Sequence, residues 1–479
     1  MAASPTKYDD LEELLQNDNK VKVAGFDVDG IVRGKYVSKK KFLSAAKPDA
    51  DFGFCSVIFG WDMHDLVYPK ELLVSNKANG YRDLSARIDL SSYRRIPWED
   101  NMPLFLIRFH TQDGSPLPVC PRSLLKTVTD NIARFGSWQC MAGSEFEYFQ
   151  FAETAQSLEE KGFTKLTPLT PGNHGYSMLR TSLNKDYFLE LFDASEAFGI
   201  DVEGHHTETG PGVYETALAY TEVTRMADMA VLYKLLAKSV GMKHGITPTF
   251  MAKPWANLAG CSGHLHVSLR DPATGNNVFA LSKDEIDAGG RANAKYPDVK
   301  FLSQLGEHFL AGVMTGLPEI MPLLCPTINS YKRLVTGEAY WAPNICSYGY
   351  DSRLASVRIL GPPDVPDYGT RFEIRVPGAD VNAPFAFSAI FSLGLYGIQN
   401  KLALPFAPID TSSSAKQDLV LLPTSLEDAT RRFMAPKSIA RKVLGDTFVE
   451  HFGGTRLHEV NLFNQAVTNW EMERYMELV

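Results

Sequence analysis

The densest group of side chains that could do chemistry lies in residues 201–215. Its possible cation ligands are three carboxylates and two imidazoles: Glu203, Glu208, Glu215, His205 and His206. Buried charge is costly unless it is paired or metal-bound, whereas Mg²⁺ and Mn²⁺ take several oxygen ligands from different directions. Glycines and a proline between these residues predict a bent backbone. A metal site and a solvated polar loop both fit this segment alone, and a helix expected at residues 217–238 would fix one end of it.

A second acidic group lies in residues 144–149, which read as a strand. Side chains alternate along an extended chain, so Glu145 and Glu147 share one face while Phe146 and Tyr148 share the other. A half-exposed strand with solvated glutamates gives the same pattern, and the segment alone does not separate the two interpretations.

The same alternation applies to residues 260–269, where a glycine-rich bend precedes His264, His266 and Ser268 on one face. Two imidazoles at this spacing suit the edge of a metal or phosphate site. A hydrogen-bonded structural pair suits the spacing equally well.

Arginines are concentrated between residues 333 and 375 of this acidic chain. They are Arg333, Arg353, Arg358, Arg371 and Arg375. Guanidinium groups suit carboxylates and phosphates. Exposed solubilising charge does not explain why Arg371, Glu373 and Arg375 alternate with apolar residues, so we expect them on the inner face of a strand.

Carboxylates, imidazoles and arginines on one surface would favour a divalent cation between anions, and chemistry on a polyphosphate and a carboxylate substrate. The sequence contains no GxxxxGK[ST] motif and no GxGxxG after a strand. A P-loop and a dinucleotide-binding fold are therefore not indicated.

The elements that must position these residues fall into two predicted domains, at residues 1–112 and 113–479. In the first, strand-forming runs on both sides of Asp29-Gly30 predict a hairpin, and further strands are expected at residues 85–110. Residues 111–121 are rich in Pro, Gly, Asp and Ser, which marks the boundary. A helix should follow at residues 121–136, a strand at 244–255, a helix at 300–325 and helices from 422 onward.

Composition limits the partners. The chain has 479 residues and a formal net charge of −8, which argues against nucleic acid or an anionic membrane as the main partner. No CxxC pair and no run of 18 apolar residues occurs, so we expect free thiols and a cytoplasmic protein without membrane spans.

Taken together, the motifs resemble the glutamine synthetase family of type I over nearly the whole chain. The matching segments, in order, are Glu145-Phe-Glu147, residues 203–215, Gly263-His264-Leu-His266-Val-Ser268, Asn329-Ser-Tyr-Lys-Arg333, residues 353–358 and Arg371-Phe-Glu373-Ile-Arg375. The resemblance implies an α+β fold with an N-terminal β-grasp domain and a large catalytic domain that has a curved antiparallel sheet, as guanido kinases also do. It also implies two stacked rings of identical subunits, a decamer or dodecamer, with active sites shared between neighbours.

The resemblance further implies an ATP-dependent ligase that joins the γ-carboxylate of L-glutamate to ammonia through γ-glutamyl phosphate, with two or more Mg²⁺ or Mn²⁺ ions in each site. One metal would be held by Glu147, Glu208 and Glu215, and the other by Glu145, His264 and Glu373. Glutamate would be bound by Arg333, Arg375 and Gly260. Arg353 would contact the transferring phosphoryl group, and ATP would be bound by His206, His266, Ser268, Arg358 and Arg371.

The sequence departs from the ammonia-using pattern at two places. A glutamate usually precedes the Ala-Pro of the flap after the Tyr-Lys-Arg motif, but Trp341 stands there and the nearest acid is Glu338. The aspartate that usually helps to bind ammonium has only Asp62 as a candidate. An aromatic residue at the flap suits a larger amine. Ammonia, with Glu338 or Asp62 assisting, and a polyamine or other larger amine therefore both stand as acceptors.

Two other classes of function were weighed against this ligase. A catalytically silent scaffold or regulator would be expected to lack metal ligands, and all six are present in the sequence. A guanidino kinase shares the architecture of the catalytic domain, but the hairpin and the carboxylate-rich segment argue against it.

Overall fold

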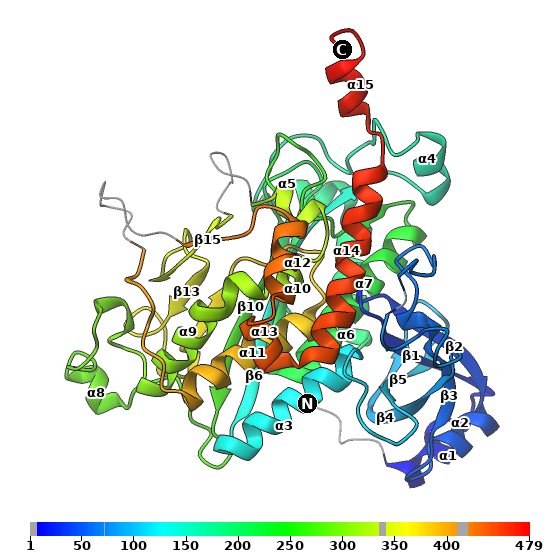
Figure 1. The fold of residues 1–479 in the computed structure, drawn as a ribbon. Helices are drawn as coiled ribbons and strands as arrows, with labels where there is room; N and C mark the ends of the chain where they lie inside the picture. Colours follow the sequence, from blue (N-terminus) through cyan, green and yellow to red (C-terminus); the bar gives the residue numbers. More distant parts are fainter. Residues whose placement is uncertain (1–6, 71, 335–341, 410–419) are drawn as a thin grey trace.

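The computed structural model describes residues 7–70, 72–334, 342–409 and 420–479. Figure 1 shows a small N-terminal sheet beside a larger body of strands and helices, with the last helix projecting away from the rest. In the part of the chain that is described, no helix combines the length and hydropathy needed to span a membrane.

The N-terminal sheet has the strand order β2-β1-β5-β4-β3. Its strands are β1 (Lys20–Phe26), β2 (Val32–Ser38), β3 (Phe52–Cys55), β4 (Asp83–Ile96) and β5 (Met102–His110). Strands β1 and β5 are parallel and the other neighbours are antiparallel. The predicted hairpin is confirmed, and its turn is held by Asp27, whose carboxylate accepts the backbone N–H groups of Asp29 and Ile31 at 3.0 and 2.9 Å. Helices α1 (Leu11–Leu14) and α2 (Lys39–Ala45) lie beside this sheet.

The large sheet has the order β12-β13-β14-β10-β6-β8-β7, and β9 pairs with β6. Its strands are β6 (Gln139–Phe151), β7 (Val202–Thr207), β8 (Tyr214–Glu222), β9 (Thr247–Thr249), β10 (Gly263–Arg270), β12 (Tyr348–Tyr350), β13 (Val357–Leu360) and β14 (Arg371–Ile374). All neighbours are antiparallel except β12 and β13, which are parallel. A separate ribbon pairs β11 (Ile345–Cys346) with β15 (Val420–Leu421). The α+β class with a curved, mainly antiparallel sheet is thereby confirmed.

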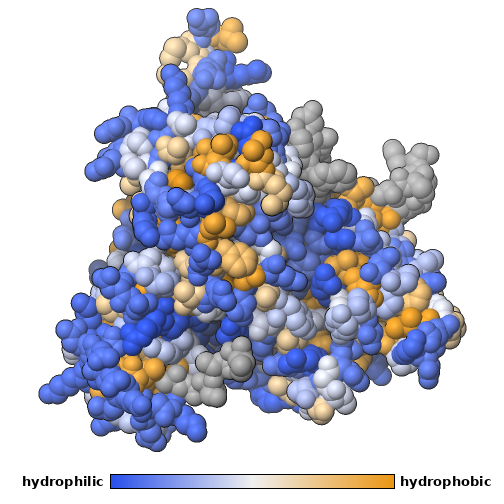
Figure 2. Space-filling view, turned by 180° about the vertical axis from the view of Figure 1, so that it is seen from behind, coloured by the Kyte–Doolittle hydropathy of each residue, from blue (hydrophilic) through white to orange (hydrophobic). Residues whose placement is uncertain are grey.

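Helices pack against the large sheet and around one another. They are α3 (Pro121–Gly136), α4 (Ala155–Glu160), α5 (Met178–Thr181), α6 (Lys185–Ala197), α7 (Val223–Lys243), α8 (Lys283–Asp287), α9 (Gln304–Gly316), α10 (Met321–Leu324), α11 (Ala383–Gln399), α12 (Leu426–Met434), α13 (Ile439–Leu444), α14 (Asp446–Gln465) and α15 (Asn469–Tyr475). Helix α7 packs on β6 and β8, while α11 is buried against α3, α7 and α9. Because helices cover one face of the large sheet, its polar side chains lie on the other face. The surface seen from behind mixes hydrophilic areas with hydrophobic patches (Figure 2).

Three predicted elements were wrong in extent. Residues 217–222 continue strand β8, and the helix begins only at Val223, because these residues pair with β6 and β7. Of residues 244–255 only Thr247–Thr249 form a strand. The apolar stretch at 300–325 is broken into α9, a 3₁₀ turn and α10, since Pro318 and Pro322 interrupt the backbone hydrogen bonds of a continuous helix. The segment at 201–215 is a pair of strands joined by a turn rather than a loop.

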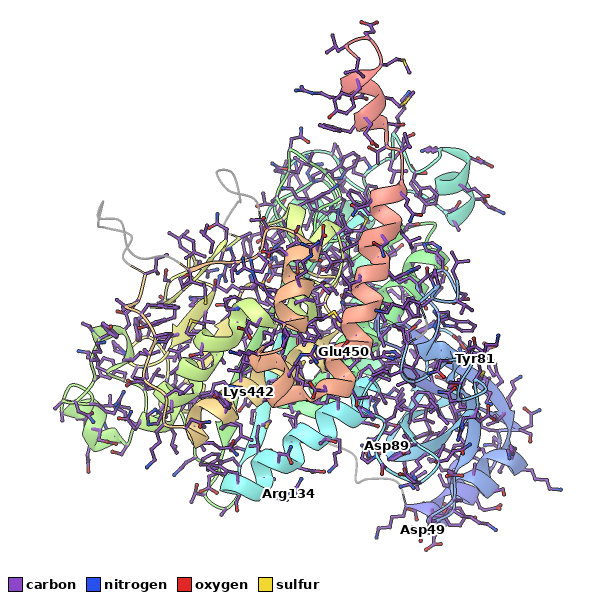
Figure 3. All side chains as sticks on the ribbon, in the orientation of Figure 1. Asp49, Tyr81, Asp89, Arg134, Lys442 and Glu450 are labelled. Carbon is purple, nitrogen blue, oxygen red and sulfur yellow. The ribbon has the colours of Figure 1, made fainter. Side chains whose placement is uncertain are left out.

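The N-terminal sheet is joined to the larger body by charged groups. Arg122 of α3 donates to Asp228 of α7 at 2.7 Å and to Asp89 of β4 at 2.8 Å. Burial acts to raise the pKa of Asp89, but the charges of Arg122 and Arg108 outweigh it and lower that pKa to about 2. Figure 3 shows Asp89 where the N-terminal sheet meets α3. Removing Arg122 or one of its two carboxylate partners would therefore leave a buried charge without its counter-charge.

Candidate active site

A cavity of about 670 Å³ lies on the polar face of the large sheet. It brings together fourteen of the residues predicted from the sequence. They are Glu145, Glu147, His206, Glu208, Glu215, Gly260, His264, His266, Arg333, Arg353, Arg358, Arg371, Glu373 and Arg375. Residues that are more than two hundred positions apart in the chain therefore meet in one concave site.

Strand register explains how acids from different strands meet. Glu147 of β6 lies opposite Glu215 of β8, which in turn lies opposite His206 of β7. Directly opposed residues have Cβ atoms about 5 Å apart. A similar pairing sets His264 of β10 against Glu145 of β6. The sheet thus aligns two rows of cation-binding side chains across neighbouring strands.

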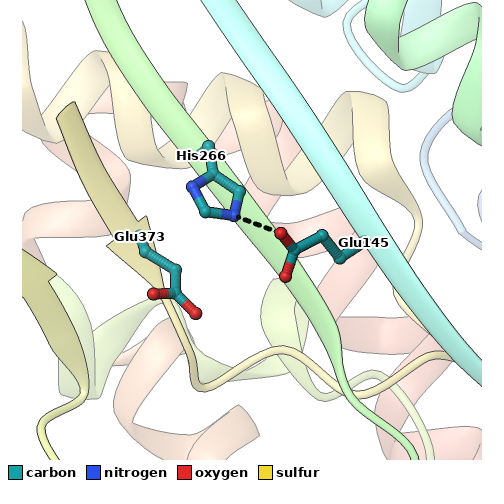
Figure 4. A group of neighbouring side chains, drawn as sticks. All are labelled: Glu145, His266 and Glu373. Carbon is teal, nitrogen blue, oxygen red and sulfur yellow. Dashed lines mark ion pairs between the residues drawn. The ribbon is translucent and has the colours of Figure 1, made fainter. Parts of the chain in front are cut away.

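The first group of possible ligands surrounds Glu145, and three of its members are drawn in Figure 4. The Nδ1 atom of His264 lies 3.6 Å from a Glu145 oxygen and 3.4 Å from a Glu373 oxygen. The Nε2 atom of His266 lies 3.2 Å from the other Glu145 oxygen. Ligand atoms of Glu145, His266 and Glu373 all lie within 4.8 Å of one another, which is close enough to share one ion. We call these four residues the Glu145 group.

The second group consists of Glu147, His206, Glu208 and Glu215, and we call it the Glu215 group. Ligand atoms of His206, Glu208 and Glu215 all lie within 4.8 Å of one another. The Nδ1 atom of His206 is 3.0 Å from the carbonyl oxygen of Thr207. A carbonyl only accepts, so Nδ1 carries the proton, and in neutral His206 the Nε2 lone pair is left facing Glu215 at 3.7 Å. Glu147 accepts the backbone N–H of Ser262 at 2.5 Å, which fixes its carboxylate at the edge of this group.

The two groups differ in their electrostatics. Burial and the charges of Glu147, Glu145, Glu208 and Glu373 all raise the pKa of Glu215 well above its usual range. Burial also acts to raise the pKa of Glu145, but the neighbouring imidazoles of His264 and His266 outweigh it and hold that pKa well below its usual range.

The pKa of Glu373 is lowered by its neighbours in the same way as that of Glu145. Burial opposes ionisation, but the charges of His264, His266 and Arg375 outweigh it and lower the pKa of Glu373 to about 2. The cavity therefore has one end where negative charge is compensated by the protein and one end where it is not.

Arginines line the same cavity beside the acids. Arg358 donates to Glu373 at 3.0 Å and also binds Asp351, and Arg375 forms an ion pair with Glu373. Arg371 donates to Nδ1 of His266 at 3.2 Å and to the carbonyl oxygen of Gly369 at 2.9 Å. These side chains are held in place before any ligand arrives, which reduces the ordering cost of binding an anion.

Comparisons with known proteins agree with this geometry. The family model described as "Glutamine synthetase, catalytic domain" matches residues 118–475. The chain belongs to the glutamine synthetase family. Membership makes it a ligase of the glutamine synthetase type, and implies use of ATP with a divalent cation and assembly into an oligomer.

Three curated relatives cover most of the chain. "Type-1 glutamine synthetase 2" of Dictyostelium discoideum is 43% identical and covers 99% of this chain and 88% of its own. A glutamate–isopropylamine ligase of a Pseudomonas species is 33% identical, with 97% and 96% covered. A gamma-glutamylethanolamide synthetase of Streptomyces coelicolor is 31% identical, with 94% and 91% covered.

A solved structure named "GmaS/ADP complex" superimposes with a TM-score of 0.78 at 24% identity, over 98% of this chain and 99% of its own. This likeness supports the glutamine synthetase fold.

Of the predicted site residues that the structure describes, two do not line this cavity. Ser268 lines an adjoining cavity of about 350 Å³, which shares Glu145, His266 and Arg371 with the first. Asp62 is 3.0 Å from His458 of α14 and does not line the cavity of its own chain. Glu338, like the flap residue Trp341, lies outside the described residues.

The structure adds Tyr176, which sequence reasoning missed. Its ring stacks on His206 with centroids 4.4 Å apart, and its backbone N–H donates to the carbonyl of Thr207 at 2.7 Å. The residue has a φ of +55°, a left-handed conformation that non-glycine residues seldom adopt. The sequence signals a turn at Pro171-Gly172-Asn173, but nothing in it indicates that this turn folds over His206.

Proposed function

We propose that the protein is an ATP-dependent ligase that joins the γ-carboxylate of L-glutamate to ammonia through γ-glutamyl phosphate. The observation that carries this proposal is the cavity itself, where two groups of cation ligands face five arginines. Membership of the glutamine synthetase family supports the reaction class. The proposal adds the roles of the individual residues and the identity of the acceptor.

The donor set fits divalent cations. Carboxylate oxygens with few imidazole nitrogens suit Mg²⁺ or Mn²⁺ rather than a soft metal. The pKa of Glu215 is raised by its burial and by the charges of neighbouring acids, and a bound cation would supply the opposing positive charge. We assign one cation to Glu147, Glu208 and Glu215.

The second cation is assigned to Glu145, Glu373 and His264 rather than His266. Arg371 donates to Nδ1 of His266, so the proton of the neutral ring is on Nε2, the atom that faces Glu145. A protonated nitrogen has no lone pair for a metal. The Nδ1 atom of His264 instead faces both carboxylates. His266 then serves as a hydrogen-bond donor that orients Glu145.

Arginines and backbone would position the two anionic substrates. Arg333 and Arg375 are placed for the glutamate carboxylates, next to Gly260, where a Cβ atom would lie 2.9 Å from Arg333 Cγ. Arg353 is assigned to the transferring phosphoryl group. Nucleotide binding is assigned to Arg358, Arg371, His206 and His266, with Ser268 in the adjoining cavity.

The chemistry follows from the charges. An oxygen of the glutamate γ-carboxylate attacks the γ-phosphorus of ATP, and ADP leaves. Bound divalent cations would supply charge neutralisation for the phosphates. Arg353 and its neighbours stabilise the negative charge that spreads over the phosphoryl oxygens. Ammonia, with its lone pair free, then attacks the acyl carbon and phosphate leaves. The ammonium that arrives must lose a proton, so a carboxylate at that end of the cavity is needed as base.

A larger amine is the second candidate acceptor. The aromatic stack of Tyr176 on His206 offers an apolar surface beside the acids, and aromatic faces favour cationic amines. Two relatives above 30% identity are named for isopropylamine and ethanolamide products. In this alternative Trp341 replaces the flap carboxylate. In the ammonia proposal, Glu338 or Asp62 would help to bind ammonium instead.

Phosphate release with glutamate, ATP and a panel of acceptors tests both candidates. The panel is ammonium, isopropylamine, ethanolamine and putrescine at equal concentration. Ammonium should give the highest kcat/KM under the main proposal, and one of the larger amines under the alternative. No release with any acceptor would contradict the ligase proposal, and ATP binding without turnover would favour a silent regulator.

The proposal includes the assembly and the location. We place the protein in the cytoplasm, as a double ring of ten or twelve copies, with residues 1–112 acting as a domain at the contact between neighbours. Asp62 would then act in a neighbouring subunit's site. Sedimentation or mass photometry of the purified protein would give the number of copies.

A further inference from the structure

The turn at residues 327–333 leads into Arg333 and is fixed by reciprocal bonds. The backbone N–H of Thr327 donates to Oγ of Ser330 at 3.0 Å, and the N–H of Ser330 donates to Oγ1 of Thr327 at 3.1 Å. Arg333 follows directly, with its N–H on the carbonyl of Ser330. The 3₁₀ helix η6 (Asn329–Lys332) forms the middle of this turn.

Both hydroxyls donate to one carboxylate. Oδ2 of Asp380 lies 2.7 Å from Thr327 Oγ1 and 2.6 Å from Ser330 Oγ. A hydroxyl has a single proton, so once it donates to Asp380 its oxygen can only accept. Because both hydroxyl protons point to Asp380, both hydroxyl oxygens are free to accept the two backbone N–H groups of the turn.

Asp380 belongs to the segment that follows strand β14. In this segment, the carbonyl of Pro377 accepts the N–H of Gly263 at 3.0 Å, and the N–H of Ala379 donates to Cys261 at 3.1 Å. The carbonyl of Val381 accepts from Nζ of Lys234 at 2.7 Å. The carboxylate is therefore anchored to the strands that carry His264 and Glu373.

The turn at residues 327–333 also positions two parts of the assigned glutamate site, Gly260 and Arg333. Asn329 forms two bonds with the backbone of Lys253, at 2.7 and 2.9 Å, and the segment that follows Lys253 leads to Gly260. Arg333 donates to the carbonyls of Val376 and Arg375 at 2.9 and 3.1 Å. Among the described residues, two of its five N–H groups are thus used in fixing the guanidinium, and the other three can bind an anion.

We propose that Asp380 is a positioning residue for glutamate binding, acting through Thr327 and Ser330 to hold Arg333 and Gly260 at the cavity. This inference rests on the proposed function, since Arg333 is assigned there to the glutamate carboxylates. Asp380 itself does not line the cavity and touches no substrate. Its loss should therefore change the affinity for one substrate and leave the reaction steps at the phosphates unchanged.

The test is steady-state kinetics of Asp380→Ala and Asp380→Asn with glutamate and ATP varied separately. A displacement of about 1 Å at a substrate-binding group lowers kcat/KM by up to about a hundredfold. We expect the KM for glutamate to rise between about tenfold and a hundredfold, with kcat and the KM for ATP within about twofold of wild type.

A matched control is Glu319→Ala. Glu319 performs the same kind of task elsewhere, accepting from Ser438 Oγ at 3.0 Å and from the backbone N–H of Ile439 at 2.5 Å, and it is not part of the cavity. It should lose stability without a change in the KM for glutamate. If Asp380→Ala does not fold, Thr327→Val removes one of the two hydroxyls at constant volume, and Thr327→Ser should restore the wild-type KM.

The outcomes separate this inference from the proposed function. A wild-type protein without glutamate-dependent phosphate release would overturn both. An active wild type with an unchanged glutamate KM in Asp380→Asn and Thr327→Val would overturn the positioning role alone. So would equal changes in the KM values for glutamate and ATP, because these would indicate general damage to the cavity.

Discussion

The Glu145 group and the Glu215 group have almost the same ligands but opposite electrostatics. At the Glu145 group, two imidazoles and the arginines on Glu373 compensate the carboxylates, so the pKa values of Glu145 and Glu373 fall. At the Glu215 group, burial and neighbouring acids raise the pKa of Glu215. Two cation sites built on one sheet can therefore differ in how far the protein offsets their negative charge: Arg358 and Arg375 pair with Glu373 in the first, whereas neighbouring acids add to the charge of Glu215 in the second.

The largest difference between the two groups is expected at Glu208. We expect Glu208→Ala to lower metal-dependent turnover by at least about a thousandfold, because the Glu215 group would retain too few ligands to hold its cation. Phosphate release at varied Mg²⁺ measures this effect. A rate near that of wild type at saturating Mg²⁺ would contradict the assignment of this cation to Glu208.

A substitution in the Glu145 group should lower the free energy of unfolding as well as the activity. Glu373→Gln leaves Arg358 and Arg375 without their shared carboxylate, and removing one partner of a buried ion pair costs about 3–5 kcal/mol. Urea unfolding of the metal-free protein measures the loss. Asp351→Asn is the control, since Asp351 is a more exposed partner of Arg358 and its removal should cost about 1 kcal/mol or less.

Substituting the two histidines of the Glu145 group should have an intermediate effect, on the affinity for a divalent cation. His264→Asn should weaken divalent-cation affinity more than His266→Asn does, by about tenfold, because only His264 is assigned as a ligand and His266 orients Glu145. Titration of Mn²⁺ followed by its electron paramagnetic resonance signal measures both affinities without turnover. Equal affinities in the two variants would assign the same role to both rings.

The smallest expected effect is a gain in stability, whereas the other substitutions cause losses. Glu215→Gln replaces a carboxyl whose ionisation is opposed by burial and by neighbouring acids, so the metal-free protein should gain about 1 kcal/mol of stability while turnover is lost. Unfolding in the presence of a chelator measures the gain. In saturating Mg²⁺ the order should reverse, because only the wild type is stabilised by the bound ion.

Local patterns were sufficient to predict much of the site. Alternation along strands placed Glu145 with Glu147, His264 with His266, and Arg371 with Glu373 and Arg375, and the cavity contains all of them. The residue roles and the boundary at residue 112 stay predictions, since geometry alone does not assign them.

Longer-range features could not be predicted. Residues 217–222 are rich in helix formers, yet tertiary pairing with β6 and β7 makes them a strand. The fold of Tyr176 over His206 and the separate cavity that contains Ser268 depend on which strands are neighbours. That order comes from contacts distant in sequence, which no local pattern records.

The junction at Arg122 has a consequence for how subunits could influence one another. Arg122 joins α3 to α7 and to β4, while Asn382 donates to the carbonyl of Val28 at 3.1 Å and Arg456 pairs with Asp29. These bonds join β4 and the turn of the β1–β2 hairpin to α3, to the start of α11 and to α14 of the larger body. A displacement of the N-terminal sheet by an adjoining copy would therefore reach α7 through Arg122, and α7 packs on the catalytic strands β6 and β8.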